Sequence, residues 1–285
     1  MTKHAMTKHQ MIYRQLEITT RCNYGCFYCA GRDMPQQDMA WDTFTDIVDG
    51  IDTSGSEGGA TVSLQGEGEP TLHPRFWDMV AYVHRKGHMP YSIINGSRVD
   101  VARVARWFPQ IGVSLDTLDP AIAEKIGRYN LPKVLANLEA LCAAMGPQRI
   151  VLMTVNLGQT LDELKAWAQQ RGFASHVVQP LKTKADYARR YEKHLVRAVP
   201  TGLQTAQAAA APEIAAAAPV PRSCRFLHQD LMRYYTVTGL ALPCCFIKDT
   251  EGIESIASLQ TSLAQGHVPK GCAGCDELRV VAAAQ

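Results

Sequence analysis

The chain has 285 residues, of which 46% are hydrophobic, and its formal net charge at pH 7 is only +2. This length suits one large α/β domain with a smaller module, and the near balance of charge gives no basic surface for DNA or RNA. The first residues are polar, and no apolar run is long enough to span a bilayer. We therefore expect a cytoplasmic protein that binds neither nucleic acid nor membranes and keeps its nine cysteines reduced.

Short β-rich runs alternate with stretches of helical periodicity along the first two thirds of the chain. The runs that predict strands are 13–19, 60–65, 91–95, 111–116, 150–156 and 175–180. Apolar residues at helical spacing predict helices near 41–51, 76–83 and 134–142. Strands that alternate with helices indicate a parallel sheet with right-handed crossovers. We predict an α/β fold, a partial (β/α)6 TIM-like barrel, whose chemistry lies on the loops that follow the strands.

The character of the chain changes after residue 182. A charged stretch that predicts a helix begins at 184, and an Ala/Pro-rich stretch follows at 205–221. The last segment is rich in cysteine and too short to build much core alone, so we expect a metal to stabilise it. The predicted divisions are a flexible N-terminus (1–12), the barrel (13–182), a helix and linker (183–222) and a small C-terminal cysteine-rich module (223–280).

Three cysteines follow the first predicted strand in "RCNYGCFYCAG" (21–31), namely Cys22, Cys26 and Cys29. Three thiolates can hold three irons of a four-iron cube and leave the fourth iron open. The spacing Cys-x3-Cys-x2-Cys, with Tyr28 before the third cysteine, resembles the signature of radical S-adenosylmethionine (SAM) enzymes. A zinc knuckle without an obvious fourth ligand, or three chance cysteines, is the alternative.

The resemblance implies a definite chemistry for these cysteines. In that family a [4Fe–4S] cluster binds SAM at its open iron, and one electron cleaves SAM to a 5′-deoxyadenosyl radical. The radical abstracts a hydrogen atom from the substrate, while the protein positions and shields the reactants. An electron donor such as flavodoxin or ferredoxin is implied as a partner.

Several strand ends resemble SAM-binding motifs of the same family. "QGEGEPTLHP" (65–74) resembles the Gly-Glu-Pro motif, which implies that Gly68, Glu69 and Pro70 shape a turn whose backbone, together with Glu69, receives the SAM amino group. Arg128 matches an arginine that pairs with the SAM carboxylate. The resemblance places further residues near the nucleoside, the methionyl group or the substrate: Asn95, Ser97, Ser114, Asp116 and Asn156. An ordinary Gly/Pro turn and structural polar residues at strand ends are the alternatives.

Four cysteines in the last segment resemble the Twitch module, a shortened relative of the SPASM extension. They are Cys224, Cys244, Cys272 and Cys275. The resemblance implies a second, auxiliary [4Fe–4S] cluster with four thiolate ligands, and a zinc ribbon is the alternative. Cys245 is left over as an alternative ligand, a structural residue or a hydrogen-atom donor.

Three classes of function compete on these grounds. The first is a radical SAM oxidoreductase or epimerase that dehydrogenates or epimerises a small polar molecule such as an aminosugar or aminocyclitol. The second is a maturase of ribosomally made peptides or of proteins, which forms epimers, thioethers, cross-links or formylglycine. The third is a non-catalytic metal scaffold, which the intact three-cysteine loop disfavours. We expect the first class.

Overall fold

The structure is a computed structural model of the chain, and it describes residues 12–54, 58–182, 184, 186–188, 220–228 and 232–281. The expected flexible N-terminus at 1–12, apart from residue 12, and most of the expected helix and linker at 183–222 lie outside the described residues. Within the described ranges, no helix combines the length and the apolar character needed to cross a membrane.

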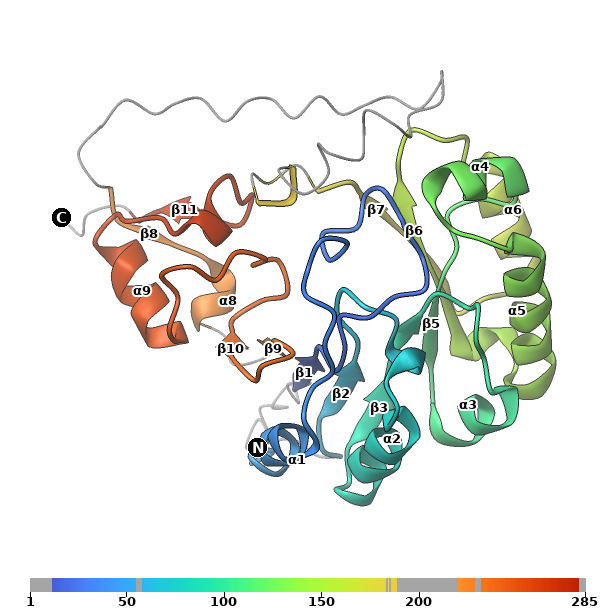
Figure 1. The fold of residues 1–285 in the computed structure, drawn as a ribbon, viewed down its shortest axis with the longest axis horizontal. Coiled ribbons are helices and arrows are strands. Elements are labelled where there is room, and N and C mark those ends of the chain that lie inside the picture. Colours follow the sequence, from blue (N-terminus) through green and yellow to red (C-terminus); the bar gives the residue numbers. More distant parts are fainter. Residues whose placement is uncertain are drawn as a thin grey trace, which may run out of the picture.

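A curved run of parallel strands forms the centre of the molecule (Figure 1). The strands are β1 (Tyr13–Leu16), β2 (Thr61–Leu64), β3 (Met89–Tyr91), β4 (Ile93–Ile94), β5 (Ile111–Ser114), β6 (Ile150–Asn156) and β7 (Ser175–Pro180). They pair in parallel and in chain order, with one break in the ladder between β3 and β4. All six predicted strands are present, and the predicted partial barrel is confirmed.

Ser92 bridges that break. Its hydroxyl donates a hydrogen bond to the carbonyl of Leu64 on β2 at 2.7 Å, and its own carbonyl accepts from the amide of Gly112 on β5 at 2.8 Å. One residue thus links both halves of the barrel, and the single strand predicted at 91–95 is divided into two short ones.

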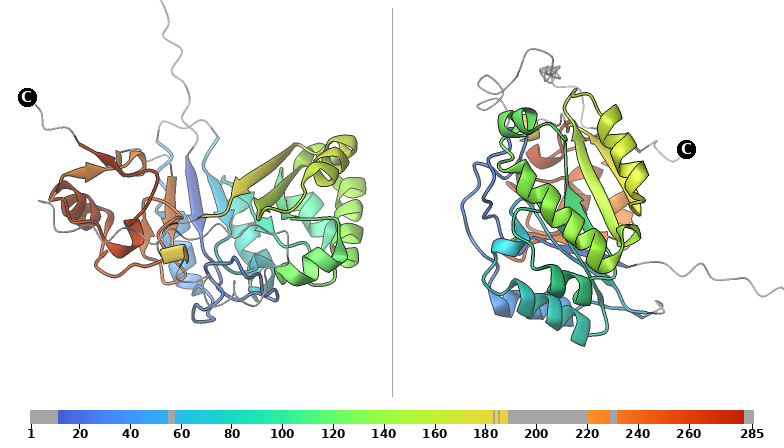
Figure 2. Two further views of the ribbon diagram at one scale, coloured as in Figure 1. Left: turned by 90° about the horizontal axis from the view of Figure 1, so that it is seen from above. Right: turned by 90° about the vertical axis from the view of Figure 1, so that its right-hand side faces the viewer.

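Helices cover the outer face of the strands (Figure 2). They are α1 (Trp41–Asp49), α2 (Phe76–Arg85), α3 (Val101–Trp107), α4 (Pro120–Ile126), α5 (Leu131–Met145) and α6 (Asp162–Arg171), with short 3-10 turns η1 (Pro70–Leu72) and η2 (Pro147–Arg149). The predicted helices correspond to α1, α2 and α5, which bury two, four and five residues. The sequence analysis did not identify α3, α4 and α6, because α3 and α4 are only seven residues long and α6 is largely polar, so none of them shows a long apolar face.

The last described residues, 220–228 and 232–281, which we name the C-terminal module, pack beside β1 (Figure 1). It contains β8 (Arg222–Ser223), α8 (Arg225–His228), β9 (Met232–Tyr235), β10 (Ala241–Leu242), α9 (Ile256–Ala264), η3 (Lys270–Cys272) and β11 (Arg279–Val280). The β9–β10 hairpin joins the barrel sheet, because β9 pairs in parallel with β1. The module also has its own apolar cluster, including Leu242, Leu259 and Leu263.

Candidate active site

The loop after β1 presents the first three cysteines. It is fastened to the end of α4 by two backbone bonds, from Gly25 N to Gly127 O and from Phe27 N to Ile126 O, both 3.0 Å. Gly127 has a φ of +93°, and a Cβ atom there would lie 2.3 Å from the carbonyl oxygen of Gly25. Only glycine permits this backbone conformation and this approach together. The position of the cysteine loop therefore depends on how α4 ends.

The three thiols differ in exposure but line one cavity. Cys26 is buried and Cys29 is half-buried. Cys22 is exposed when the whole residue is considered, although it also lines the cavity. Burial raises the pKa of the Cys22 thiol to about 11, and it also raises the pKa of Cys26 and Cys29. These thiols are protonated at neutral pH in the absence of a metal, so binding a metal centre here releases protons.

The loop after β2 forms the adjoining side of this cavity. A Cβ atom on Gly68 would lie 2.5 Å from Thr19 O and 2.6 Å from Arg21 O, so the two loops touch along their backbones. Glu69 is buried, and its carboxylate accepts hydrogen bonds from the Thr71 hydroxyl and from the amide of Asn95, both at 2.6 Å. Burial raises the pKa of Glu69.

Asn95, after β4, continues the site toward the cysteine loop. Its Nδ2 donates to Asn23 Oδ1 at 2.9 Å, and Asn23 Nδ2 donates to Ser97 Oγ at 2.9 Å. The Ser97 hydroxyl in turn donates to Asn95 Oδ1 at 2.7 Å. The three side chains form a closed ring of hydrogen bonds. Asn23 was missed by the sequence analysis, although it stands next to Cys22.

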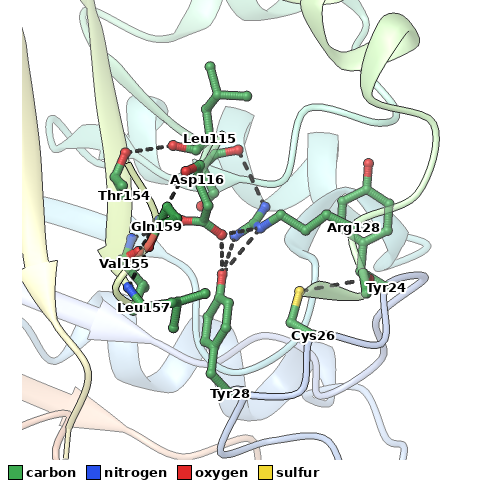
Figure 3. Close-up of polar contacts among 12 residues, drawn as sticks. Tyr24, Cys26, Tyr28, Leu115, Asp116, Arg128, Thr154, Val155, Leu157 and Gln159 are labelled. Carbon is green, nitrogen blue, oxygen red and sulfur yellow. Dashed lines mark hydrogen bonds and ion pairs between the residues drawn. The ribbon is translucent and has the colours of Figure 1, made fainter. Parts of the chain in front are cut away.

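Asp116, Arg128 and Tyr28 form a buried polar network on the β5 side (Figure 3). Arg128 Nε lies 2.6 Å from Asp116 Oδ2, and the Tyr28 hydroxyl donates to the same oxygen at 2.5 Å. Arg128 Nη2 donates to the Tyr28 oxygen at 2.8 Å. The other Asp116 oxygen accepts from the amide of Val155 at 2.8 Å. The network joins the cysteine loop, the end of α4 and the end of β6.

Most of the residues predicted to bind SAM meet at one cavity of about 330 Å³, which we name the barrel cavity. Those on its lining are Tyr28, Gly68, Glu69, Asn95, Ser114 and Arg128. Ser97 and Asp116 are bonded to lining residues, and Pro70 begins η1. Asn156 is exposed, is not part of the lining, and accepts a hydrogen bond from Gly158 N at 3.0 Å within a turn.

The C-terminal module completes the barrel cavity with residues that the sequence analysis passed over, except Cys245. Lys248 lies beside Cys245 on this lining and forms an ion pair with Glu67 of the β2 loop, with both side chains largely buried. Glu67 Oε2 also lies 3.7 Å from the Cys29 sulfur. Tyr187, which precedes the C-terminal module in the chain, also lines the barrel cavity. No local sequence pattern indicates a pair formed between residues so far apart in the chain.

A second, smaller cavity lies inside the C-terminal module, and we name it the module cavity. Its lining includes all four remaining predicted ligands: Cys224, Cys244, Cys272 and Cys275. Burial raises the pKa of Cys244 and of Cys272 to about 12. Cys244 lines the module cavity and Cys245 lines the barrel cavity, so these consecutive residues face different spaces. Phe246 lines both cavities. Among the described residues, no three His, Cys, Asp or Glu side chains converge on a single metal ion.

Comparison with known proteins decides the family. The Radical SAM superfamily matches residues 16–170, which is more than half of the chain. The chain belongs to the radical SAM superfamily. Among solved structures, Streptococcus suis SuiB bound to S-adenosylmethionine is similar to this chain, with a TM-score of 0.63 at 13% identity over 90% of this chain and 66% of that one. The likeness shows that the two share the radical SAM fold.

Two curated relatives match part of the chain. An S-adenosylmethionine-dependent nucleotide dehydratase of Selenomonas ruminantium is 30% identical over 166 residues, or 54% of this chain and 60% of that protein. GTP 3′,8-cyclase 1 of Pseudomonas aeruginosa is 33% identical over 172 residues, or 55% of this chain and 50% of that protein. The chain thus spans between half and three fifths of the length of these relatives.

Membership of the radical SAM superfamily implies a [4Fe–4S] cluster and SAM as cofactors. The lining of the barrel cavity suits both. Three thiols come from one loop and provide soft ligands for iron. Beside them lie a backbone without a Cβ atom at Gly68, the acidic Glu69 and the cationic Arg128, which suit the charged ends of an amino acid.

Proposed function

We propose that Cys22, Cys26 and Cys29 hold a [4Fe–4S] cluster whose open iron binds SAM in the barrel cavity. The observation behind this proposal is that three thiols of one loop share a cavity with the SAM-motif residues Gly68, Glu69 and Arg128. When bound, these cofactors supply a 5′-deoxyadenosyl radical that abstracts a hydrogen atom from a substrate carbon. The protein binds, orients and shields the reactants.

The chain's own residues have distinct proposed roles toward SAM. Glu69 and the backbone beside Gly68 receive the amino group, and Arg128 receives the carboxylate with N–H groups of its fork. Asp116 and Tyr28 hold the guanidinium in place by the contacts of 2.5–2.8 Å described above. Asn95, Ser97 and Ser114 orient the ribose or the methionyl group. Asn156, which lies in a turn outside the cavity lining, keeps its proposed contact to the nucleoside.

The proposed substrate is a small polar molecule, such as an aminosugar or aminocyclitol, that is dehydrogenated or epimerised. The wall of the barrel cavity beyond the cysteine loop offers a carboxylate at Glu67, an ammonium group at Lys248 and one hydroxyl at Tyr187, and such groups bind polar substituents. The names of the two curated relatives denote nucleotide substrates, which are also small and polar. SuiB with its precursor peptide SuiA shares only the fold at 14% identity, so it carries no argument for a peptide substrate.

Cys245 is the proposed hydrogen-atom donor of the epimerase form of this reaction. It lines the barrel cavity on the wall of the C-terminal module, whereas the cluster cysteines lie on the loop after β1. Its S–H bond would break homolytically, and the hydrogen atom would join the substrate radical. The sulfur radical left behind would take one electron from an external donor such as flavodoxin or ferredoxin and one proton from solvent, which restores the thiol.

The four cysteines of the module cavity are the proposed ligands of an auxiliary [4Fe–4S] cluster. Four thiols around one enclosed space form a donor set that suits such a cube, and zinc is the competing metal. We also propose the domain division of the sequence analysis, with the barrel at 13–182 and the auxiliary module at 223–280. The pairing of β9 with β1 supports a module that is fixed to the barrel.

The experiment that tests this function is SAM cleavage by the anaerobically reconstituted chain. With a strong reductant and SAM, the protein should release methionine and 5′-deoxyadenosine in equal amounts, slowly even without substrate. Replacing Cys22, Cys26 and Cys29 together by alanine should abolish both products, while the Cys142→Ala control should keep them, because Cys142 lies on α5 away from both cavities. Protein that contains only zinc after anaerobic purification would contradict the proposal.

A further inference from the structure

Lys184 is a buried lysine whose ammonium group lies between the loops that carry Cys244 and Cys272. Only 6% of its side chain is exposed. Its Nζ donates a hydrogen bond to the carbonyl oxygen of Phe246 at 2.6 Å and another to that of Gly271. Phe246 stands two residues after Cys244, and Gly271 directly precedes Cys272. One side chain therefore connects both loops.

Asp186 stabilises the ammonium group at this buried position. Its carboxylate is 1% exposed and lies 3.2 Å from Lys184 Nζ. The same carboxylate accepts a hydrogen bond from the backbone amide of Lys248 at 3.0 Å. Breaking a buried pair of this kind by removing one partner is strongly destabilising, whereas an apolar pair of similar volume is often equally stable. Stability alone does not explain why charges are used here.

The two loops also pack directly against each other. A Cβ atom on Gly271 would lie 2.1 Å from the carbonyl oxygen of Asp249 and 2.9 Å from Ile247 Cγ2. Their separation is thus set by backbone contact on one side and by Lys184 on the other. Lys184 itself lines the module cavity together with the four cysteines.

We propose that Lys184 is a positioning residue of the auxiliary centre, because it holds the carbonyls next to Cys244 and Cys272 and so fixes the spacing of these two ligands. The inference rests on the proposed auxiliary cluster. Groups that orient metal ligands in this way typically change metal affinity by about 10- to 100-fold when they are removed. The positive charge also offsets part of the negative charge that four thiolates bring to the centre, which favours its reduction.

The test uses the full chain with Cys22, Cys26 and Cys29 replaced by alanine, so that the auxiliary centre is the remaining cluster. After anaerobic reconstitution this background should bind about four irons. Adding Lys184→Met with Asp186→Asn removes both charges and avoids leaving a buried carboxylate unpaired. We expect a chelator to remove iron at least about tenfold faster from this variant. Lys184→Arg in the same background should release iron about as slowly as the background itself, because arginine keeps the positive charge and the hydrogen-bond donors.

Controls separate this role from a general effect on folding. Lys270 is an exposed lysine that stands next to Gly271 and forms an ion pair with Glu251. Lys270→Met should leave the rate of iron release unchanged. In the chain with all its cysteines, the Lys184→Met and Asp186→Asn variant should keep about four irons at the first centre. Loss of those irons too would contradict a role confined to the auxiliary centre.

Two further outcomes distinguish this inference from the proposal beneath it. If the background without the first three cysteines binds no iron, the proposed auxiliary cluster is contradicted, and so is the proposed role of Lys184. If the background binds about four irons and the Lys184 variant releases them at the same rate, the proposed auxiliary cluster is supported and only the inference about Lys184 is contradicted.

Discussion

Arg128 shows how single residues prepare the barrel cavity. Its guanidinium is held by Asp116 and by the Tyr28 hydroxyl, and its Nη1 donates to Ser114 O at 3.3 Å. The pair with Asp116 is almost fully buried, so breaking it by removing one partner would be strongly destabilising. The direction in which Arg128 points is therefore fixed by the protein. A ligand carboxylate would meet a guanidinium whose orientation needs little rearrangement.

Cys245→Ala is the prediction that belongs to the residue scale. The variant should still form 5′-deoxyadenosine in the presence of substrate, because the first centre is intact. It should lose the epimerised product, because alanine has no hydrogen atom that a carbon radical can readily remove. Product analysis by mass spectrometry after reaction in deuterated water measures this. Iron content should stay at about eight, which excludes a role for Cys245 as a cluster ligand.

Cys142→Ala serves as the matched control for Cys245→Ala. It also removes one half-buried thiol, but from α5, outside both cavities. It should leave product and iron unchanged. Epimerised product that still takes up solvent deuterium in the Cys245 variant would contradict the donor role.

The end of α4 shows how an element places the chemistry. The helix stops at Gly127 in a left-handed conformation, and its last carbonyls accept the amides of Gly25 and Phe27 from the cysteine loop. Cys26 Sγ also lies 4.0 Å from Gly127 O. The barrel thus positions its three thiols through a helix terminus as well as through the strand that precedes them.

Gly127→Ala tests this dependence at the element scale. The substitution adds strain at positive φ and a clash with the Gly25 carbonyl, so we expect a loss of about 1–3 kcal/mol in the free energy of unfolding and weaker iron binding at the first centre. Urea unfolding of the metal-free chain and iron analysis after reconstitution measure the two effects.

Gly172→Ala is the control for Gly127→Ala. Gly172 also ends a helix at positive φ, +70°, but nothing else in the described structure lies within 4 Å of the added Cβ atom. It should cost some stability and leave iron binding intact. Equal loss of iron in both variants would contradict a specific role for the contact between α4 and the cysteine loop.

At the scale of the whole molecule, the sequence predicted what local patterns encode. The six predicted strands are β-rich runs, and the three cysteines of the first loop have a spacing that resembles the family signature, so the strands could be recognised and the cysteine site could be proposed without coordinates. The pairing of β9 with β1 and the ion pair of Lys248 with Glu67 could not, because each joins residues far apart in the chain. The same holds for Lys184, whose partners lie in two distant loops. Contacts of this kind depend on topology, which periodicity does not report.

The attachment of the C-terminal module decides what the barrel cavity contains. Because β9 extends the barrel sheet beside β1, the loop after β10 reaches the cavity and adds Cys245, Phe246 and Lys248 to its lining. Val237 N also donates to Glu17 Oε2 at 3.3 Å, which fastens the hairpin to the end of β1. A substrate bound there would contact both parts of the molecule.

The most direct test of the central claim is electron paramagnetic resonance of the reduced first cluster with and without SAM. A variant that lacks Cys272 and Cys275 isolates this cluster, which should contain about four irons. SAM should change the spectrum, because its amino and carboxylate groups would bind the iron that Cys22, Cys26 and Cys29 leave open. A spectrum that stays the same at saturating SAM, in a sample with its full complement of iron, would contradict the account.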